Sequence, residues 1–264
     1  DENRLMNKKY APNLVATMLK TGTTTRTKKQ ISDQLHRIKT DISIFGNPSG
    51  AVININTDKQ NLSAALVLLD DLLRNPKFDE TEFEKVKLDA KANLEAYKND
   101  PQSLATEKLL KLTTNYPKGH PEYASSSDES LEDLANTSLD DVKTFYKDFY
   151  GANNSISAFV GELDKKLVTD FLQKAFGNWN SKMMFATIKP KYFDVKGTTE
   201  TIKTPDKTSA ILFGNININI SETHIDFPAM FMAKELLGGG AFLSSRIPQR
   251  LRENEGMSYG AGTF

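Results

Sequence analysis

The amino-acid sequence predicts an α+β fold in which a largely antiparallel sheet carries helices on one face, followed by the start of a second, similar α+β domain. Two patterns indicate this class. Short segments alternate apolar and polar side chains, as half-buried strands do, and longer segments repeat apolar residues every three or four positions, as amphipathic helices do. The length of 264 residues adds a third observation, because a single domain usually has about 100 to 150 residues.

The amino-terminal part predicts helices and one hairpin. Each helix is recognised by its apolar spacing and by a glycine or proline that ends it. The hairpin is recognised by two alternating segments on either side of the turn sequence Asn-Pro-Ser-Gly. In order, the predicted elements are helices at 12–20 and 27–38, strands at 40–46 and 51–57, a helix at 61–74, and a long helix from Asp79 to the Asn-Asp-Pro break at 99–101.

Capping signals predict where two of the later helices start. Asp79 with Glu82, and Ser138 with Asp141, have the spacing of a capping box, in which each side chain can accept a hydrogen bond from a backbone N–H of the first turn. The remaining predicted elements are a helix at 102–114, a loop at 116–130, a helix at 138–149, a strand at 154–163, a helix at 164–177, a strand at 209–220 and a helix from Asp226 to the glycines at 238–240.

The order of these elements predicts two domains. Residues 1–185 are expected to form the first, and residues 186–208, which contain many lysines and threonines but no long apolar period, are expected to be a linker. Residues 209–264 are expected to begin a second domain that stops early, because Tyr259 looks like the first residue of a further strand.

Composition excludes several kinds of partner and site. Lysine plus arginine equals aspartate plus glutamate at 34 each, so the chain as a whole has no charge that favours nucleic acid. Cysteine is absent, which excludes disulfides and zinc sites built on thiolates. No run approaches the roughly 18 apolar residues of a membrane-spanning helix, so membrane insertion is not expected.

Acidic and imidazole side chains form no recognisable catalytic constellation. The pairs Asp70-Asp71 and Asp140-Asp141 are adjacent in sequence, so on a helix they point about 100° apart, and we expect solvated faces or helix caps. The histidines at 36, 120 and 224 lack partners at metal-ligand spacing. Surface or core-edge histidines are expected, although a metal site assembled by folding stays open.

The carboxyl-terminal stretch carries the most distinctive pattern. Three glycines at 238–240 precede Arg246, Arg250 and Arg252, and Tyr259 follows seven residues after Arg252. Taken alone, the glycines are typical of a helix end, Arg252 could pair with its neighbour Glu253 on the surface, and Tyr259 could be an aromatic residue of an edge strand. The surrounding string favours a functional pair instead.

Three segments resemble a known family: "SLEDLANTSLDDVKTFYKDFYGANNSISAFVGELD", "FLQKAFGNW" and "LLGGGAFLSSRIPQRLRENEGMSYGAGTF". In this order and spacing they resemble the second half of the insulinase/pitrilysin/mitochondrial-processing-peptidase family, the inverted-zincin metallopeptidases. A weaker resemblance covers residues 11–100. It implies pitrilysin-type domains, of which the first lacks its initial strands and the second is truncated, so that the chain is a fragment.

The resemblance implies that this chain binds no metal. Family members place a His-x-x-Glu-His helix where "NLVAT" stands here and a third glutamate ligand further on. The corresponding residues of this chain are Asn13, Ala16, Thr17 and, near the distal position, Lys91. These groups cannot hold zinc as a set, so zinc is expected in the catalytic half and no cofactor in this chain.

The resemblance also implies a role for the carboxyl-terminal motif. Arg252 and Tyr259 match a pair that the zinc-less half offers in trans to the zinc site of the other half, where they would serve catalysis. Gly238, Gly239, Gly240, Ser245 and Arg246 belong to the same motif and are expected to contact substrate.

Together these inferences predict the non-catalytic half of a bilobed zinc metalloendopeptidase, which encloses peptide substrates and is inactive alone. Its partner would be a catalytic half on the same polypeptide or on a separate subunit. The alternative is a degenerate structural or peptide-binding subunit without a role in proteolysis. The bacterial members of the family suggest a periplasmic or other extracytoplasmic location.

Overall fold

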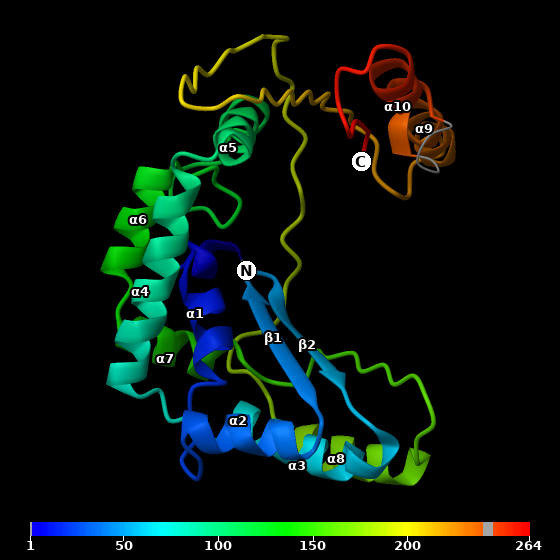
Figure 1. The fold of residues 1–264 in the computed structure, drawn as a ribbon. Helices are drawn as coiled ribbons and strands as arrows, with labels where there is room; N and C mark the ends of the chain where they lie inside the picture. Colours follow the sequence, from blue (N-terminus) through cyan, green and yellow to red (C-terminus); the bar gives the residue numbers. More distant parts are fainter. Residues whose placement is uncertain (1, 240–244) are drawn as a thin grey trace. The chain divides into compact units, whose positions relative to one another are not determined.

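The computed structural model describes residues 2–239 and 245–264, and the chain divides into two compact units (Figure 1). The first unit extends to Asn215 and the second starts at Ile216. The first combines helices with a two-stranded antiparallel sheet, which confirms the α+β class. The linker predicted at 186–208 stays a prediction, since the division between the units falls beyond it.

The hairpin forms where the alternating pattern predicts it. Strand β1 (Asp41–Asn47) pairs with β2 (Gly50–Asn56), with Ile42 opposite Ile55 and Ile44 opposite Ile53. These isoleucines share one face, as alternation requires, and helix α1 (Ala11–Met18) packs against β1. A Cβ at position 46 would lie 2.2 Å from the Pro12 carbonyl oxygen, so only glycine allows α1 to approach β1 this closely.

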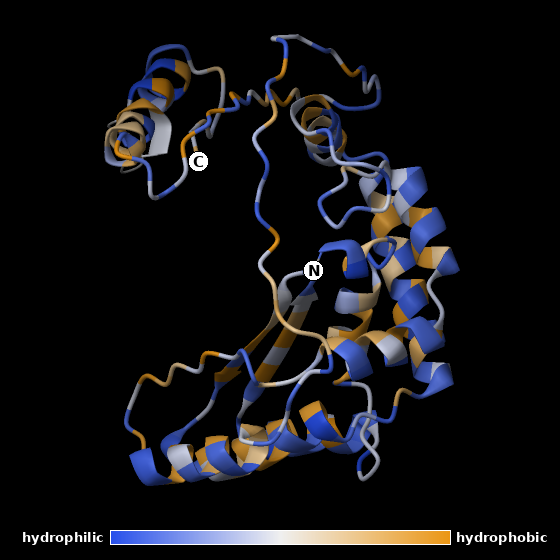
Figure 2. Ribbon diagram, turned by 180° about the vertical axis from the view of Figure 1, so that it is seen from behind, coloured by the Kyte–Doolittle hydropathy of each residue, from blue (hydrophilic) through white to orange (hydrophobic). Residues whose placement is uncertain are grey.

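Most of the predicted helices are confirmed. The core contains apolar residues of α1, α3, α4, α7 and the hairpin, with α1 packed against the strands and against α4 and α7. Figure 2 shows apolar residues along the strands and as stripes on the helices. The helices of the first unit are η1 (Glu2–Leu5), α1, α2 (Lys28–Arg37), η2 (Lys59–Asn61), α3 (Leu62–Arg74), α4 (Glu80–Tyr97), α5 (Pro101–Thr113), α6 (Ser127–Asn136), α7 (Leu139–Phe149) and α8 (Lys165–Phe176).

Capping side chains explain where α7 and α4 begin, and why the predicted loop at 116–130 ends too late. The capping box of α7 is present, because Ser138 and Asp141 each accept the other's backbone N–H. At α4 the Asp79 carboxylate accepts from two backbone N–H groups, but Glu82 does not return a bond. The loop predicted at 116–130 is wrong at its end, since α6 begins at Ser127 behind another complete capping box, Ser126 with Glu129, within a serine-rich stretch.

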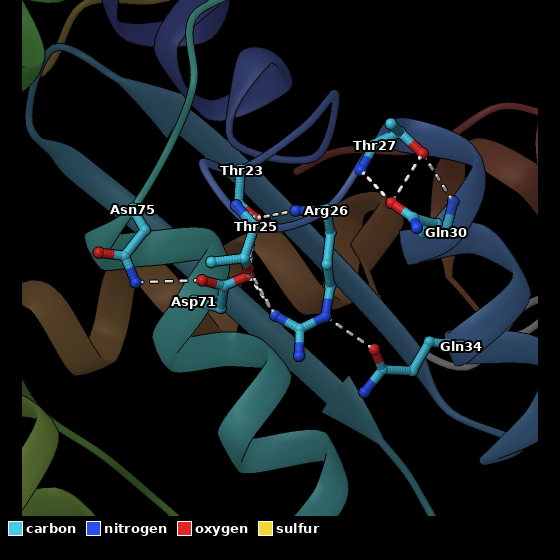
Figure 3. A network of polar contacts seen from close by, with 8 residues as sticks. All are labelled: Thr23, Thr25, Arg26, Thr27, Gln30, Gln34, Asp71 and Asn75. Atoms are coloured by element: carbon cyan, nitrogen blue, oxygen red, sulfur yellow. Dashed lines mark hydrogen bonds and ion pairs between the residues drawn. The ribbon is translucent and has the colours of Figure 1, made fainter.

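A buried carboxylate holds the loop between α1 and α2 against α3 (Figure 3). Asp71 is only 7% exposed, so the expectation of a solvated face was wrong for it. The hydroxyls of Thr23 and Thr25 donate to it at 2.7 and 3.0 Å, and the Arg26 guanidinium lies at 2.6 Å. Burial raises the pKa of this carboxyl, but the hydrogen bonds it accepts outweigh burial and lower the pKa overall.

Three segments predicted as strands are not strands within the described residues. Residues 154–163, 209–220 and the tail after Tyr259 form no ladder. A strand requires a partner for its backbone N–H and C=O groups, and alternation of side chains cannot supply one. Ile156 and Ile216 are accordingly 99% and 83% exposed.

The second unit is small and helical. It contains α9 (Phe227–Lys234), a π-helical turn η3 (Glu235–Gly239), the short α10 (Arg246–Pro248) and a second π-helical segment η4 (Gln249–Asn254). Its tail returns to α9, because the Thr263 hydroxyl donates to the Lys234 carbonyl oxygen at 2.9 Å. Among the described residues of the chain, no helix has both the length and the apolar character needed to cross a membrane.

Candidate functional site

The helix at the predicted metal position offers no ligand set. On α1, Asn13 is exposed, Thr17 is half-buried and Ala16 is 1% exposed. The Thr17 hydroxyl donates to the Asn13 carbonyl oxygen at 3.0 Å. The Ala16 methyl group has no lone pair for a cation. The Asn13 amide and the Thr17 hydroxyl are poor ligands for zinc, which prefers imidazole, thiolate and carboxylate.

The distal position is no better suited to a metal. Lys91 is exposed on α4, and its ammonium lies 3.7 Å from the Glu95 carboxylate, one turn along the same helix. Across residues 2–239 and 245–264, no three histidine, aspartate or glutamate side chains come together in a way that could hold a metal ion. The residues at these four positions therefore do not fit a zinc ion.

In the second unit, the structure brings Arg252 and Tyr259 together. The guanidinium carbon of Arg252 lies over the Tyr259 ring, 4.9 Å from the ring centroid, which is cation–π geometry. The Arg252 Nε also lies 3.5 Å from the Glu253 carboxylate, so the expected surface pair with Glu253 is present as well. The Tyr259 side chain is 87% exposed, which leaves it open to another molecule.

A glycine turn explains the seven-residue spacing. The Met257 N–H donates to the Leu251 carbonyl oxygen at 2.8 Å and the Gly256 N–H to that of Arg252 at 3.2 Å, and these two bonds close the π-helical segment η4. Gly256 has φ +60°, the left-handed conformation in which helices commonly end and which glycine adopts without strain. The chain reverses there, and three residues later Tyr259 lies beside Arg252. This role of Gly256 was not predicted from the sequence, although a glycine directly after a predicted helix is the pattern that indicates such a turn.

The other predicted site residues within the described part of the chain lie at the end of η3 and at the start of α10, in the same unit as Arg252 and Tyr259. Gly238 belongs to η3, and a Cβ there would lie 2.8 Å from the Thr263 backbone nitrogen, so glycine permits the tail to approach. Gly239 ends η3, and Gly240 lies outside the described residues. Ser245 is 3% exposed and Arg246, the first residue of α10, is exposed.

A separate polar cavity of about 350 Å³ lies in the first unit, at the amino-terminal end of α1. Lys9 lines it, with its ammonium donating to the Ser125 hydroxyl at 2.7 Å and the Tyr123 carbonyl at 3.2 Å. Burial lowers the pKa of this lysine. His120 and Asp141, which the sequence analysis considered, line this cavity, but none of the residues that the family resemblance assigns to metal, catalysis or substrate does.

Two family models match the chain, in the order that the sequence resemblance predicts. Residues 10–123 match the model described as "Insulinase (Peptidase family M16)", and residues 136–264 match "Peptidase M16 inactive domain". Between them they leave only residues 1–9 and 124–135 unmatched. The chain belongs to the M16 peptidase family. The resemblance is thereby confirmed, and the motif with Arg252 and Tyr259 falls within the inactive-domain match.

Similar proteins agree with this assignment. The chain is 22% identical over 244 residues to an "uncharacterized zinc protease YmxG" of Bacillus subtilis and 24% identical over 246 residues to an "uncharacterized zinc protease" of Rickettsia felis. Each match covers 92% of this chain and 57% of the relative, so the chain spans little more than half the length of these relatives.

Solved structures share the fold. A peptidase M16 inactive domain from Pseudomonas fluorescens has a TM-score of 0.69 at 21% identity, and the match covers 97% of this chain and 62% of the other. A protease from Helicobacter pylori has a TM-score of 0.73 at 18% identity, with 99% and 62% covered.

Proposed function

We propose that this chain is the non-catalytic half of a two-part zinc metalloendopeptidase of the M16 family. In this proposal it encloses peptide substrates and offers Arg252 and Tyr259 to the reaction centre of a catalytic half, which holds the zinc and lies on the same polypeptide or on a partner subunit. The observation that carries the proposal is the contact of the Arg252 guanidinium with an exposed tyrosine ring inside the region that matches the inactive-domain model.

The chemistry of the pair suits peptide cleavage. The Tyr259 hydroxyl can donate a hydrogen bond to the oxyanion that develops at the scissile carbonyl, and the Arg252 guanidinium has several fixed donors for substrate carbonyls. The Gly256 turn orders both groups before substrate arrives, and such preorganisation is what makes a donor effective in the transition state. Loss of one such donor raises the barrier by about 2.7–4 kcal/mol.

The test is turnover of a peptide by the chain together with its catalytic half. Tyr259→Phe keeps the ring under Arg252 and removes only the hydroxyl, so kcat should fall by about 10²- to 10³-fold while zinc content is unchanged. Arg252→Ala should also reduce kcat/KM.

Two substitutions serve as controls, one beside Arg252 in the second unit and one at a tyrosine of the first unit. Arg250→Ala removes an arginine two residues away that pairs with Glu255, and Tyr192→Phe removes another exposed tyrosine hydroxyl. Both should retain full turnover. Normal cleavage by Tyr259→Phe would contradict the catalytic role and favour a structural or peptide-binding subunit.

A further inference from the structure

Residues 186–207, here called the strap, follow α8 without helix or strand, and some of them contact α5 and the loop after it. The strap meets α5 and the loop after it in reverse order, so it runs antiparallel to the helix. The contacts, in order along the strap, pair Lys191 and Phe193 with Tyr116, which follows α5, and Glu200 with Lys108 within α5. The Phe193 and Tyr116 ring centroids lie 4.9 Å apart, and the Glu200 carboxylate lies 3.5 Å from the Lys108 ammonium.

The strap is anchored at its start by a buried side chain. Ile188 is 9% exposed and packs in the main apolar core of the first unit, whereas Lys189 after it is exposed. Beyond Ile188 every described residue of the strap is exposed or half-buried. Its attachment after that point therefore depends on a few polar and aromatic contacts.

Five residues, here called the clasp, make the strongest of these contacts: Glu2, Tyr116, His120, Lys191 and Phe193. The Tyr116 ring stacks on His120 with centroids 4.5 Å apart and meets the Phe193 ring edge-on. The Tyr116 hydroxyl accepts the backbone N–H of Lys191 at 3.0 Å. One aromatic side chain thus holds the strap through both its ring and its hydroxyl.

An acidic side chain closes the clasp from the amino-terminal side. The two carboxylate oxygens of Glu2 lie 3.3 Å from the Lys191 ammonium and 3.5 Å from the His120 Nε2. The ring of His120 is 4% exposed and its Nδ1 accepts the Glu122 N–H at 3.0 Å, so the proton of the neutral ring lies on Nε2, toward Glu2. Three distant parts of the chain meet at this carboxylate.

Helix α5 itself is loosely held. None of its residues is buried, and its Glu107 carboxylate accepts the backbone N–H and hydroxyl of Ser127 at 3.0 and 3.1 Å. Regions with few buried apolar contacts are those that open locally while the rest of a protein stays folded. The strap can therefore leave α5 and withdraw Ile188 while the helices of the main core stay folded.

We propose that the strap is a latch that opens and closes on the α5 side of the first unit, and that the clasp sets the balance between the two states. When the latch is closed, the chain that leads to the second unit is held as far as Glu200. When it is open, the connection is longer by most of the strap. A longer flexible connection lowers the effective concentration of whatever the second unit carries.

One consequence rests on the proposed function. If Arg252 and Tyr259 serve the reaction centre of a catalytic half, the latch regulates how readily they reach it. Opening should then lower kcat/KM without changing zinc content. The latch itself is independent of that role and is tested on this chain alone.

The test uses the absence of cysteine, because a single introduced thiol is then the only one that reacts. Ile188→Cys places the thiol at the buried anchor, and its labelling rate by a thiol reagent reports opening. Glu2→Gln and Tyr116→Phe should each speed this labelling by about threefold to tenfold, the effect of losing one hydrogen bond in the closed state. Tyr192→Phe, a tyrosine of the strap outside the clasp, should leave the rate unchanged.

Two further thiols separate opening from unfolding. Leu72→Cys lies in α3 at 0% exposure and reports global unfolding, and Ile156→Cys, at 99% exposure, gives the rate of a free thiol. The proposal is overturned if the clasp variants leave labelling at position 188 unchanged, or if they speed labelling at position 72 equally. Should Ile188→Cys not fold, hydrogen exchange of the α5 amides, faster in Tyr116→Phe than in Tyr192→Phe, decides the same question.

Discussion

At the scale of single residues, the reversal at Gly256 decides whether Arg252 and Tyr259 meet. A non-glycine residue at φ +60° is strained by roughly 1–2 kcal/mol, because its Cβ approaches the following carbonyl oxygen. Gly256→Ala should therefore loosen the turn and separate the ring from the guanidinium. Nuclear Overhauser contacts between the Arg252 side chain and the Tyr259 ring should weaken, and turnover with the catalytic half should fall.

Gly260→Ala is the matched control for that substitution. Position 260 lies one residue beyond Tyr259, and a Cβ there would meet nothing within 4 Å. The contacts of the ring should survive this change. Equal loss in both variants would mean that the tail, and not the Gly256 turn, governs the pair.

Ala16 shows that packing as well as chemistry separates this chain from a metal-binding one. It is 1% exposed, and its Cβ lies 3.0 Å from where a Cβ at position 46 would be. Glutamate at position 16 would bury an unpaired carboxylate, so Ala16→Glu should lower the free energy of unfolding in urea by about 3 kcal/mol or more.

Asn13→His is the comparison for Ala16→Glu, because position 13 is exposed and substitution there should change stability by less than about 0.5 kcal/mol. The double change with Thr17→His should not give stoichiometric zinc binding by metal analysis. A stable Ala16→Glu variant that takes up zinc would show that the buried position can be reopened.

At the scale of secondary-structure elements, the Asp71 network fixes the loop that follows α1. Asp71→Asn removes a charge that accepts hydrogen bonds from two hydroxyls and a guanidinium, and bonds to charged groups contribute about 1.5–3 kcal/mol each. The variant should be destabilised by about that amount at neutral pH. Asp70→Asn, next in sequence but outside the network, should be nearly neutral.

The pH dependence of the network has a definite sign. The folded state lowers the pKa of the Asp71 carboxyl below its ordinary value of 3.8, so the stabilisation is fully present above that value. The stabilisation should be lost as the pH falls from 3.8 through the lowered pKa of the folded state, because below that pKa the folded protein also binds the proton. The stability difference between the wild type and Asp71→Asn should shrink over this acidic range in urea titrations. A difference that stays constant there would contradict the account.

Elements built from local signals could be predicted from the sequence, and those that need a distant partner could not. The helices follow from apolar spacing and caps, and the hairpin from a short turn. Residues 154–163 and 209–220 alternate as the hairpin does, yet no ladder forms in the described residues, since pairing is decided by what lies alongside. Helix α6 was missed because Ser126 and Glu129 stand among other turn-forming residues.

The candidate site divides in the same way. The string around Arg252 and Tyr259 pointed to the M16 family, and the family matches confirm that membership. The contact between their side chains depends on the hydrogen bond from Met257 to Leu251, which no spacing reveals. The burial of Asp71 could not be predicted either, because a helix with leucines on several sides does not indicate which side another element covers.

At the scale of the whole molecule, the two units differ in how much core they have. The first contains the main apolar core, whereas among the described residues of the second only Ser245 and Pro248 are buried. A segment of this size that buries so little has few interactions to offset the entropy of ordering. The second unit should therefore open far more often than the first.

Limited digestion with trypsin tests this difference. Arg246, Arg250 and Arg252 all lie in the second unit, while residues 150–163, an exposed loop of the first unit, contain no lysine or arginine. The first cuts should fall after Phe193, and mass spectrometry should find a lasting product that retains α1 to α8. That product should keep its thermal transition but no longer support turnover by the catalytic half, because Tyr259 is gone. Early cuts within α3 or α4, with the second unit intact, would reverse the order of stability argued here.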